Sequence, residues 1–359
     1  MTKEVVIFTG GGSGGHVVPA LTIIENLNKE KYEIHYIGSK NGIEAELTNG
    51  KVDTYHFVSV GKLRRYISVE NFIDIFKVFV GLIQSIFLIL KIKSKNSIVI
   101  SMGGFVSVPV VIAAKINGVK VYIHEQTTRV GLANKICSKF ADKVMVSFED
   151  SLKFFPKNKV VYTGYPVRKR FYDKEVKYNA VEDFVFHPSD REVLFITGGG
   201  NGSLLVNEKV KESLKELKSR YKIVHQVGKA HINEYEGFKD EHYLPVAFLG
   251  DEMPSIYKCA DIVISRAGAG TVCELMALNK RSIFIPLKIA QKNEQYHNAV
   301  EAKKKLGSLV IEEDEFKKLS LIDVISTFTP YTEDTVISFE NSATQKILKE
   351  CDLILDEGI

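Results

Sequence analysis

The first half of the chain alternates short apolar runs with longer stretches of helical periodicity. A short apolar run bounded by glycine or polar residues is typical of a buried strand, and apolar residues that recur every three to four positions are typical of a helix. The expected strands are Val5–Thr9, Ile34–Gly38, Ile98–Ser101, Val119–His124 and Val144–Val146, with a helix expected over Pro19–Asn28. This alternation predicts parallel strands joined by right-handed helical crossovers.

The opening of the chain recurs near its middle. Val5–Gly15 (VVIFTGGGSGG) is matched by Val193–Ser203 (VLFITGGGNGS), 188 residues further along. Further strands are expected at Lys222–Gln226, Ala260–Ser265 and Arg281–Pro286. Phe171–Arg191 is polar and has little periodicity, which indicates a linker and interdomain region near residues 164–190. The simplest interpretation is an α/β protein of two doubly wound parallel-sheet domains that face each other across a cleft and bind ligands at the carboxyl ends of their strands.

Composition agrees with two globular domains and narrows the possible partners. The chain has 359 residues, of which 45% are hydrophobic, so it can form two cores of ordinary size. Its net charge of +4 is too small to indicate nucleic acid. The cysteines Cys137, Cys259, Cys273 and Cys351 have no paired spacing, so neither a disulfide framework nor a zinc site is expected, which favours a reducing compartment. The N-terminal residues lead straight into a strand, so no signal peptide is expected.

The first glycine-rich segment formally satisfies the dinucleotide fingerprint G-x-G-x-x-G at Gly10, Gly12 and Gly15. That fingerprint also requires an acidic residue at the end of the second strand, and Ile37–Lys40 contains none. An NAD- or FAD-dependent oxidoreductase is therefore disfavoured. A phosphate-binding loop remains, because glycines let backbone N–H groups approach a pyrophosphate and a helix N-terminus favours an anion.

His16 follows this loop at the start of the expected helix, with Pro19 in the first turn. A helix N-terminus disfavours a protonated imidazole, and a neutral imidazole beside an anion site can serve as a general base. The alternative is a histidine that only caps the helix or donates to a phosphate.

Residues 60–95 combine apolar and basic side chains. Only Glu70 and Asp74 oppose seven basic residues, which are Lys62, Arg64, Arg65, Lys77, Lys91, Lys93 and Lys95. The longest charge-free apolar run, Val78–Leu90, is shorter than the ~20 residues of a membrane span, so no transmembrane helix is expected. Much of that run is expected to be core. The candidates for contact with an anionic membrane are Phe72, Ile75, Phe76 and Phe79, with Lys62, Arg64 and Arg65. The alternative is a buried crossover helix.

Several segments along the chain point to one family. They are Gly11–Pro19, Gly103–Pro109, His124–Gln126, Gly131–Lys135, Gly164–Arg168, Arg266–Glu274, and Gln295 with Asn298–Ala299. Together, and in this order, they resemble the MurG family of bacterial peptidoglycan glycosyltransferases, which is similar to glycosyltransferase family 28. The resemblance covers nearly the whole chain. It implies the GT-B fold of two Rossmann-like domains, with an acceptor and membrane-associating domain over 1–165, a UDP-sugar domain over 166–338, and a C-terminal helix at about 339–359 that packs back on the first domain.

The resemblance also implies an activity. It is the inverting transfer of N-acetylglucosamine from UDP-GlcNAc to undecaprenyl-pyrophosphoryl-MurNAc-pentapeptide (lipid I), which forms lipid II, by a peripheral enzyme on the cytoplasmic side of the cell membrane. His16 matches the position that serves in this family as the base or as an acceptor contact. Donor-binding positions are Ser13, Gly14, Gly15, Thr127, Arg168, Gly200, Gly250, Ala269, Gly270, Thr271, Val272, Cys273, Glu274 and Gln295. Acceptor or phosphate contacts are Gly12, Gly104 and Asn134.

These implied roles make physical sense for two side chains. The carboxylate of Glu274 can accept hydrogen bonds from both hydroxyls of a ribose, and the amide of Gln295 can read sugar hydroxyls. No cofactor is expected. No metal is expected either, because no Asp-x-Asp lies near either glycine loop, and helix N-termini and backbone amides are expected to stabilise the leaving UDP.

Three positions depart from the family pattern. Thr127 stands where many members have Asn, Gly200 where many have Ser, and Glu294 where many have Gln. Alternative functions are another GT-B transferase with a lipid acceptor, a UDP-sugar 2-epimerase, and a non-catalytic UDP-sugar-binding membrane scaffold. The epimerase would not need the basic and apolar residues of 60–95, and the scaffold would not need His16.

Overall fold

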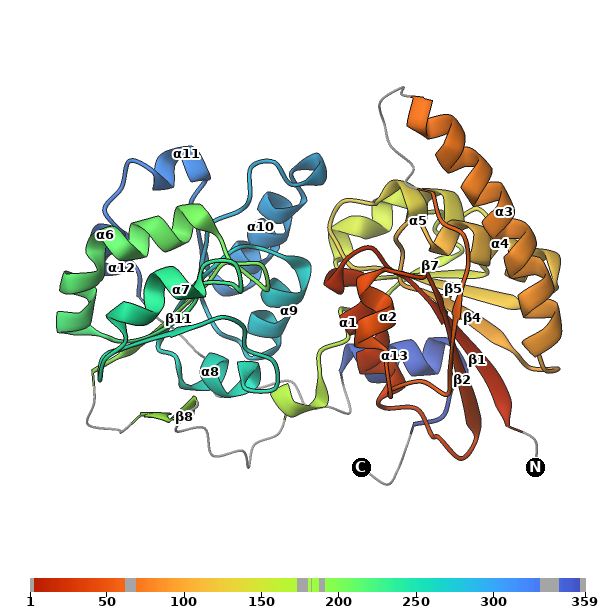
Figure 1. Cartoon of the computed structure of the whole chain (residues 1–359), viewed down its shortest axis with the longest axis horizontal. Helices are drawn as coiled ribbons and strands as arrows, with labels where there is room; N and C mark the ends of the chain where they lie inside the picture. Colours follow the sequence, from red (N-terminus) through yellow and green to blue (C-terminus); the bar gives the residue numbers. More distant parts are fainter. Residues whose placement is uncertain are drawn as a thin grey trace. The chain divides into compact units, whose positions relative to one another are not determined.

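A computed structural model of the chain describes residues 3–61, 69–172, 180–181, 183–186, 191–329 and 342–355, except for the side chains of 69–73, 180 and 291. The chain forms two compact units. The first unit is Met1–Val167 with Phe339–Ile359, and the second unit is Arg168–Ser338. Each unit is built on a parallel sheet with helices packed on it (Figure 1).

The first unit has a sheet of order β3-β2-β1-β4-β5-β6-β7. Its strands are β1 (Glu4–Thr9), β2 (Tyr32–Gly38), β3 (Thr54–Phe57), β4 (Ile98–Ser101), β5 (Lys120–Glu125), β6 (Lys143–Val146) and β7 (Val160–Tyr162). Its helices are α1 (Gly14–Ile24), α2 (Ile43–Leu47), α3 (Val69–Ile92), α4 (Ser107–Ile116), α5 (Leu132–Cys137), the 3-10 helix η1 (Glu149–Phe154) and α13 (Ala343–Glu350). The strand order reverses between β1 and β4, which is where open α/β sheets bind ligands.

Strand β1 shows how the sequence pattern builds two cores. Val5 and Ile7 point into the core shared with α3, α4 and α5, while Val6 and Phe8 point into the core shared with α1 and α13. Successive side chains of a strand alternate between the faces of a sheet, so a continuous apolar run is what a strand covered on both faces needs.

Helix α13 belongs to the first unit although it comes last in the sequence. Figure 1 shows it in blue among the red elements of the chain's beginning. Ile347 and Leu348 are buried in the core with α1, and Lys143 Nζ of β6 lies 2.6 Å from Glu350 Oε2. An isolated bridge between Leu27 and Leu355 continues the contact.

The second unit repeats the arrangement with a sheet of order β12-β11-β10-β13-β14-β15. Its strands are β10 (Val193–Thr197), β11 (Lys222–Gln226), β12 (Tyr243–Val246), β13 (Ile262–Ser265), β14 (Ile283–Phe284) and β15 (Leu309–Val310), with β8 (Ala180–Val181) and β9 (Phe184–Val185) as a separate antiparallel pair. Its helices are α6 (Leu204–Arg220), α7 (Ile232–Tyr235), α8 (Met253–Cys259), α9 (Ala269–Ala277), α10 (Glu294–Leu306), α11 (Glu313–Phe316) and α12 (Leu321–Ser326), with the 3-10 helices η2 (Lys169–Phe171), η3 (Glu236–Phe238) and η4 (Gln291–Asn293).

Every strand expected from the apolar runs is confirmed, with small shifts at its ends. The strands β3, β7, β12 and β15 were not expected, because they are short or lie at sheet edges. The interpretation of residues 164–190 as a linker is wrong in part. Phe171 and Phe184 are buried, and β8 pairs with β9. These aromatic residues have no helical or strand periodicity, so the sequence pattern does not reveal that they are buried.

Helix α3 is longer than the sequence suggests. Its segment Asp74–Ile92 has 19 residues and a mean hydropathy of 2.1. Only 17% of this apolar stretch is buried. By length and composition this helix could cross a membrane. The charge-free run Val78–Leu90 underestimated the length of this apolar helix. The helix includes Lys77 and Lys91, so it does not end where the charges begin.

The packing of α3 is that of a crossover helix. Ser85 and Ile89 are buried, and Leu82 and Ile86 pack against the core of the first unit. The strands before and after α3 lie in the same parallel sheet, so this helix returns the chain across one face of it. The expectation that much of Val78–Leu90 is core holds only for this face. The other face is exposed, and its apolar side chains are Ile75, Phe76, Phe79, Ile83, Phe87 and Leu90.

Candidate functional site

The first glycine loop, Gly10–Gly15, joins β1 to α1 at the switch point of the first sheet. Gly12 has a φ of +82°, which favours glycine. The Gly11 N–H donates to Gly103 O at 3.3 Å, and a Cβ on Gly104 would lie 2.2 Å from Gly11 O. Two glycine segments therefore pack backbone against backbone, which explains why Gly12 and Gly104 must be glycine.

The amides of this loop are not all free. The Gly12 N–H donates to Glu44 Oε2 at 3.2 Å, so the predicted phosphate contact at Gly12 would have to replace an internal bond. The N–H groups of Gly14 and Gly15 begin α1 and have no hydrogen-bond partner among the described residues. Ser13 is exposed, and its hydroxyl does not cap the helix. The backbone donors that this loop leaves available are thus those of Gly14 and Gly15.

His16 is oriented by a chain of side-chain hydrogen bonds within the first unit. Its Nδ1 lies 3.1 Å from Gln126 Oε1. The Gln126 Nε2 donates to the carbonyl of His124 at 2.9 Å, which fixes the orientation of the Gln126 amide. Because Gln126 Oε1 can only accept, the proton of neutral His16 is on Nδ1. The Nε2 of His16 then carries the lone pair that a base needs.

His124 completes this chain as a neutral side chain. It is fully buried, and burial lowers its pKa to about 4. Its Nε2–H donates to Gly164 O at 3.0 Å, which leaves Nδ1 to accept from Gln126 Nε2 at 3.3 Å. A buried imidazole that stays neutral holds the amide of Gln126 in one orientation at any physiological pH.

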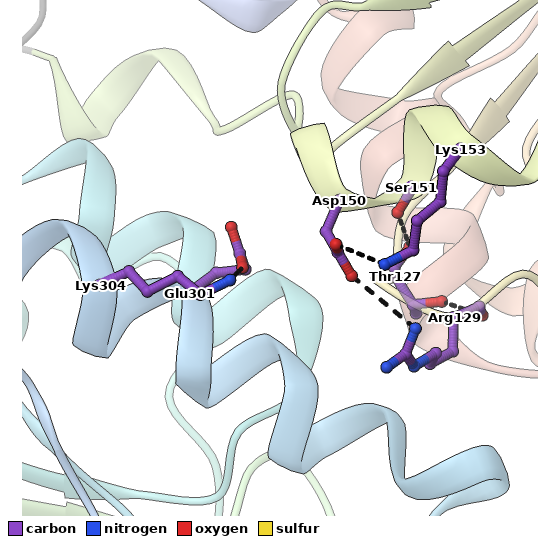
Figure 2. A network of polar contacts seen from close by, with 7 residues as sticks. All are labelled: Thr127, Arg129, Asp150, Ser151, Lys153, Glu301 and Lys304. Carbon is purple, nitrogen blue, oxygen red and sulfur yellow. Dashed lines mark hydrogen bonds and ion pairs between the residues drawn. The ribbon is translucent and has the colours of Figure 1, made fainter.

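Thr127 uses its hydroxyl inside the first unit. Its Oγ1 lies 2.9 Å from Glu125 Oε1 and donates to Arg129 O at 2.7 Å, while Ser151 Oγ donates to Thr127 O at 3.0 Å (Figure 2). The same picture shows Asp150 between Arg129 and Lys153. The structure thus places the side chain of Thr127 in a turn, where it supports Glu125 and the loop that follows.

Asn134 is a buried residue in the first turn of α5. Its Nδ2 donates to His124 O at 3.2 Å and to Glu125 Oε2 at 3.1 Å. Its Oδ1 is buried and has no partner among the described residues. A carbonyl oxygen repels a phosphate, so a contact of Asn134 to the acceptor would have to be to a hydroxyl or an N–H group.

The second glycine loop follows β10 in the second unit. Gly199 and Gly202 have positive φ angles, and Gly200 is exposed. Ser203 is buried, and its Oγ accepts from Val206 N at the start of α6 and from Arg266 Nε at 2.9 Å, so both acceptor positions of the hydroxyl are used inside the unit. The loop therefore presents backbone groups rather than a hydroxyl.

An aromatic side chain stands beside this loop. Phe248 is 53% exposed, and its ring would lie 3.6 Å from a Cβ added to either Gly200 or Gly250. An exposed ring flanked by two glycines provides a flat apolar surface with room above it. Phe248 is not predicted from the sequence, because it belongs to no motif.

Arg168 and Glu274 form the charged part of the second unit's site. Arg168 Nη1 donates to Gly250 O at 3.0 Å, and its Nη2 lies 3.8 Å from Glu274 Oε1. The Nε of Arg168 is buried and has no partner among the described residues. Burial raises the pKa of the Glu274 carboxyl to about 7, although the nearby Arg168 lowers it. Arg168 can still donate a hydrogen bond to a polar ligand, and Glu274 can still accept one.

Helix α9 begins next to this pair. Its N-cap is Gly268, which has no side chain to cap the helix, and the half-exposed Ala269, Gly270 and Thr271 form its first turn. The side chains of Val272 and Cys273 point into the core. Only their backbone could therefore contact a ligand.

Gln295 lies at the start of α10. Its Oε1 accepts from Ala267 N at 3.2 Å and from Leu287 N at 3.0 Å. The carbonyl end of this amide is thus fixed, and its Nε2 is left as a donor. Farther along α10, Lys304 pairs with Glu301 (Figure 2).

The described residues contain no group of three or more His, Cys, Asp or Glu side chains that could hold a metal ion. They bring the predicted residues into two sets. One surrounds the first glycine loop and His16, and the other surrounds Arg168 and Glu274. Gln126 belongs to the motif His124–Gln126, but nothing in the sequence indicates that its side chain is the hydrogen-bond partner of His16. Glu44 could not be found at all, because it lies on α2 rather than at the end of β2.

Comparisons with known proteins agree on one family. The sequence model of the glycosyltransferase family 28 N-terminal domain matches residues 6–146, and that of the family 28 C-terminal domain matches residues 193–354. Two relatives are named UDP-N-acetylglucosamine--N-acetylmuramyl-(pentapeptide) pyrophosphoryl-undecaprenol N-acetylglucosamine transferase. The protein of Clostridium novyi is 38% identical over 97% of this chain and 98% of its own length. That of Clostridium kluyveri is 40% identical over 96% and 97%.

Solved structures agree on the fold. The crystal structure of Acinetobacter baumannii MurG superposes with a TM-score of 0.67 at 22% identity, over 98% of this chain and 94% of that one. The structure of a UDP-N-acetylglucosamine 2-epimerase from Rickettsia bellii reaches a TM-score of 0.63 at 15% identity, over 97% of this chain and 96% of that one. Both have the GT-B fold, so fold alone does not separate a transferase from an epimerase. Because both domain models match and the identity to the N-acetylglucosamine transferases extends over almost the whole chain, this protein belongs to the MurG family within glycosyltransferase family 28.

Proposed function

We propose that this chain transfers N-acetylglucosamine from UDP-GlcNAc to lipid I with inversion at the anomeric carbon and so forms lipid II. The observation that carries the proposal is the high identity, over nearly the full length, to transferases named for this reaction. The site geometry agrees with it, because the first unit offers a base and the second unit offers partners for a nucleotide.

His16 acts as the general base. The accepting hydroxyl of the muramoyl sugar gives its proton to Nε2 of His16 as the oxygen attacks the anomeric carbon. The bond from that carbon to the UDP oxygen breaks, and UDP leaves with the electron pair. The hydrogen bond from His16 Nδ1 to Gln126 leaves the lone pair on Nε2 until the proton arrives, and it continues to hold the imidazolium that results. Gly14 and Gly15, which the family resemblance gives as donor-binding positions, are assigned here to the acceptor's pyrophosphate instead, because their N–H groups belong to the same loop as His16.

The second unit binds the donor. The ring of Phe248 stacks on the uracil, and the carboxylate of Glu274 accepts hydrogen bonds from the ribose hydroxyls. The amides at the start of α9 and the guanidinium of Arg168 neutralise the diphosphate and stabilise the UDP that leaves. The free Nε2 of Gln295 donates to a hydroxyl of the sugar.

A transfer assay tests this function directly. Radiolabelled UDP-GlcNAc and UDP-GalNAc would each be offered to a soluble lipid I analogue, and the product would be separated and counted. We expect label to move from UDP-GlcNAc alone and only when the acceptor is present. Release of free UDP with a changed hexosamine and no labelled acceptor would instead identify an epimerase.

The raised pKa of Glu274 gives a pH dependence. Only the ionised carboxylate accepts from both ribose hydroxyls, so protonation competes with the donor. With a pKa of about 7, the KM for UDP-GlcNAc should rise about tenfold between pH 8 and pH 6. The Glu274→Gln variant should show a high KM that no longer changes over this interval. A KM of the unaltered chain that stays flat from pH 8 to pH 6 would contradict this role.

We further propose that the chain binds peripherally to the cytoplasmic side of the membrane through α3. The relatives are named for an undecaprenol-linked acceptor, which lies in a membrane. The exposed apolar side chains Ile75, Phe76, Phe79, Ile83, Phe87 and Leu90 share about 120° of the helix circumference at ~100° per residue. Lys77 and Lys91 are exposed along one edge of them. This is the pattern of an interfacial helix.

The other membrane candidates, Lys62, Arg64 and Arg65, lie outside the described residues, as does the side chain of Phe72. Their role stays a prediction. Together with the basic residues of α3 they would attract an anionic leaflet, at about 1 kcal/mol for each basic side chain near the surface.

Replacing Phe76 and Phe79 by serine should weaken binding to phosphatidylglycerol vesicles at least about tenfold. Each is more than half exposed, and each would lose up to ~1.5–3 kcal/mol of apolar burial in lipid. Co-sedimentation measures the effect. Ile43→Ser is the control, because Ile43 is an exposed apolar residue of the first unit outside α3. Equal binding by the double variant and the unaltered chain would argue against α3 as the contact.

A further inference from the structure

Glu44 lies directly beneath the first glycine loop, and the mechanism above does not use it. It belongs to the short helix α2, and only 1% of it is exposed. Its Oε1 accepts from Ser39 N at 3.0 Å and from Ser39 Oγ at 2.6 Å, and its Oε2 accepts from Gly12 N at 3.2 Å. A buried carboxylate is costly unless it is hydrogen-bonded, and here both oxygens have partners.

The backbone around this carboxylate leaves space for it alone. A Cβ added to Gly11 would lie 2.5 Å from the carboxyl carbon of Glu44, and one added to Gly42 would lie 2.4 Å from it. Glycine at these two positions is therefore required to admit the Glu44 side chain. The glycine loop and the Glu44 carboxylate are therefore complementary in shape.

A glycine loop that precedes a helix is a site for an anion. In this chain the protein supplies an anion of its own to the Gly12 amide, while the amides of Gly14 and Gly15 have no partner among the described residues. Tyr36 supports the same loop from β2, because its hydroxyl donates to Gly10 O at 2.8 Å. The loop is thus held in shape before any substrate binds.

We propose that Glu44 is a positioning residue: its carboxylate acts as an internal anion that fixes the first glycine loop, and so aims the Gly14 and Gly15 amides and His16 at the acceptor substrate. The proposal rests on the proposed function in one respect, which is that this loop serves the acceptor. That Glu44 holds the loop is independent of the reaction and can be measured without it.

The Glu44→Gln variant separates the two halves of this hydrogen-bond set. The Gln side chain has one accepting oxygen, and the two donors of Ser39 will take it. Its NH2 group then faces the N–H of Gly12, so two donors oppose each other and the loop is released. Ser39→Ala is the matched control. It also removes one hydrogen bond to Glu44, but it leaves the carboxylate on Gly12.

Two measurements decide the proposal, each made on the full chain. Deuterium uptake by peptides that cover residues 9–13 should be about tenfold faster in Glu44→Gln and nearly unchanged in Ser39→Ala. In the transfer assay, Glu44→Gln should raise the KM for the lipid I analogue about tenfold and lower kcat, while the KM for UDP-GlcNAc stays within about twofold. Glu44→Asp, which keeps the charge, should recover part of the acceptor KM.

Unchanged deuterium uptake in Glu44→Gln would overturn the proposal, because the loop would then not depend on the carboxylate. Faster uptake with equal changes in both KM values would also overturn it, because it would indicate general loosening rather than positioning. If the unaltered chain transferred no sugar, the proposed function would fail. The uptake experiment would still decide whether Glu44 holds the loop.

Discussion

Replacing His16 by alanine is expected to lower kcat for transfer about 10³-fold, while the Kd for UDP-GlcNAc stays within about twofold. General-base catalysis by a positioned side chain contributes roughly 10²–10⁴-fold to a rate. His16 is placed for this role, because its Nδ1 proton is engaged by Gln126 and its Nε2 is left to accept. Single-turnover kinetics and donor binding by calorimetry would separate the two quantities.

Two further variants sharpen this test. Gln126→Leu leaves His16 in place but removes the acceptor that fixes its tautomer, so kcat should fall by only about tenfold. Val18→Ala is the control on the same helix, since Val18 is exposed and, two residues after His16, lies about 200° around the helix from it. If His16→Ala kept full activity, His16 would be a contact residue or a helix cap and the base would have to be sought elsewhere.

Replacing Leu348 by alanine is expected to destabilise the first unit by about 3 kcal/mol. Leu348 of α13 is only 2% exposed and lies in the core with β1 and α1. Removing a buried leucine side chain costs roughly 2–5 kcal/mol, because apolar contact is lost and a cavity is left. Urea unfolding followed by circular dichroism would show the loss as a lower midpoint with an unchanged slope.

The matched control for this change is Lys349→Ala, because Lys349 is the next residue of the same helix and is exposed. It should change the free energy of unfolding by less than about 0.5 kcal/mol. An equally small effect of Leu348→Ala would mean that α13 is not part of the first unit's core in solution.

The apolar runs were sufficient to predict the fold of both units. Val5–Thr9 and Val193–Thr197 are continuous apolar segments followed by glycines, and a strand buried on both faces can hardly have another pattern. Edge strands carry less information. Thr54–Phe57 alternates weakly, and Leu309–Val310 is only two residues long. Their place is decided by pairing with neighbours that are distant in sequence.

The candidate site was predictable where backbone geometry demands a residue type and hidden where side chains meet through space. Gly12, Gly104 and Gly199 have positive φ angles that favour glycine, so these positions could be recognised from the glycine motifs of the sequence. Glu44 reaches the loop from a helix, and Phe248 stands beside Gly200 only after folding. Spacing along the chain contains no signal for such contacts.

Exposure on α3 was misjudged for a physical reason. Periodicity gives the number of apolar faces on a helix but not how many of them another element covers. Ile83, Phe87 and Leu90 look like core residues in the sequence, and they are exposed because α3 packs on the first unit, chiefly on α4, through its other face.

The return of α13 to the first unit has a consequence for biosynthesis. A ribosome completes residues 1–167 long before it reaches Ile347 and Leu348, so the apolar surface that α13 covers stays exposed while the entire second unit is made. During that interval the nascent first unit exposes apolar surface that a chaperone can bind. The second unit is continuous in sequence and has no such delay, so it can reach its final state first even though it is synthesised later.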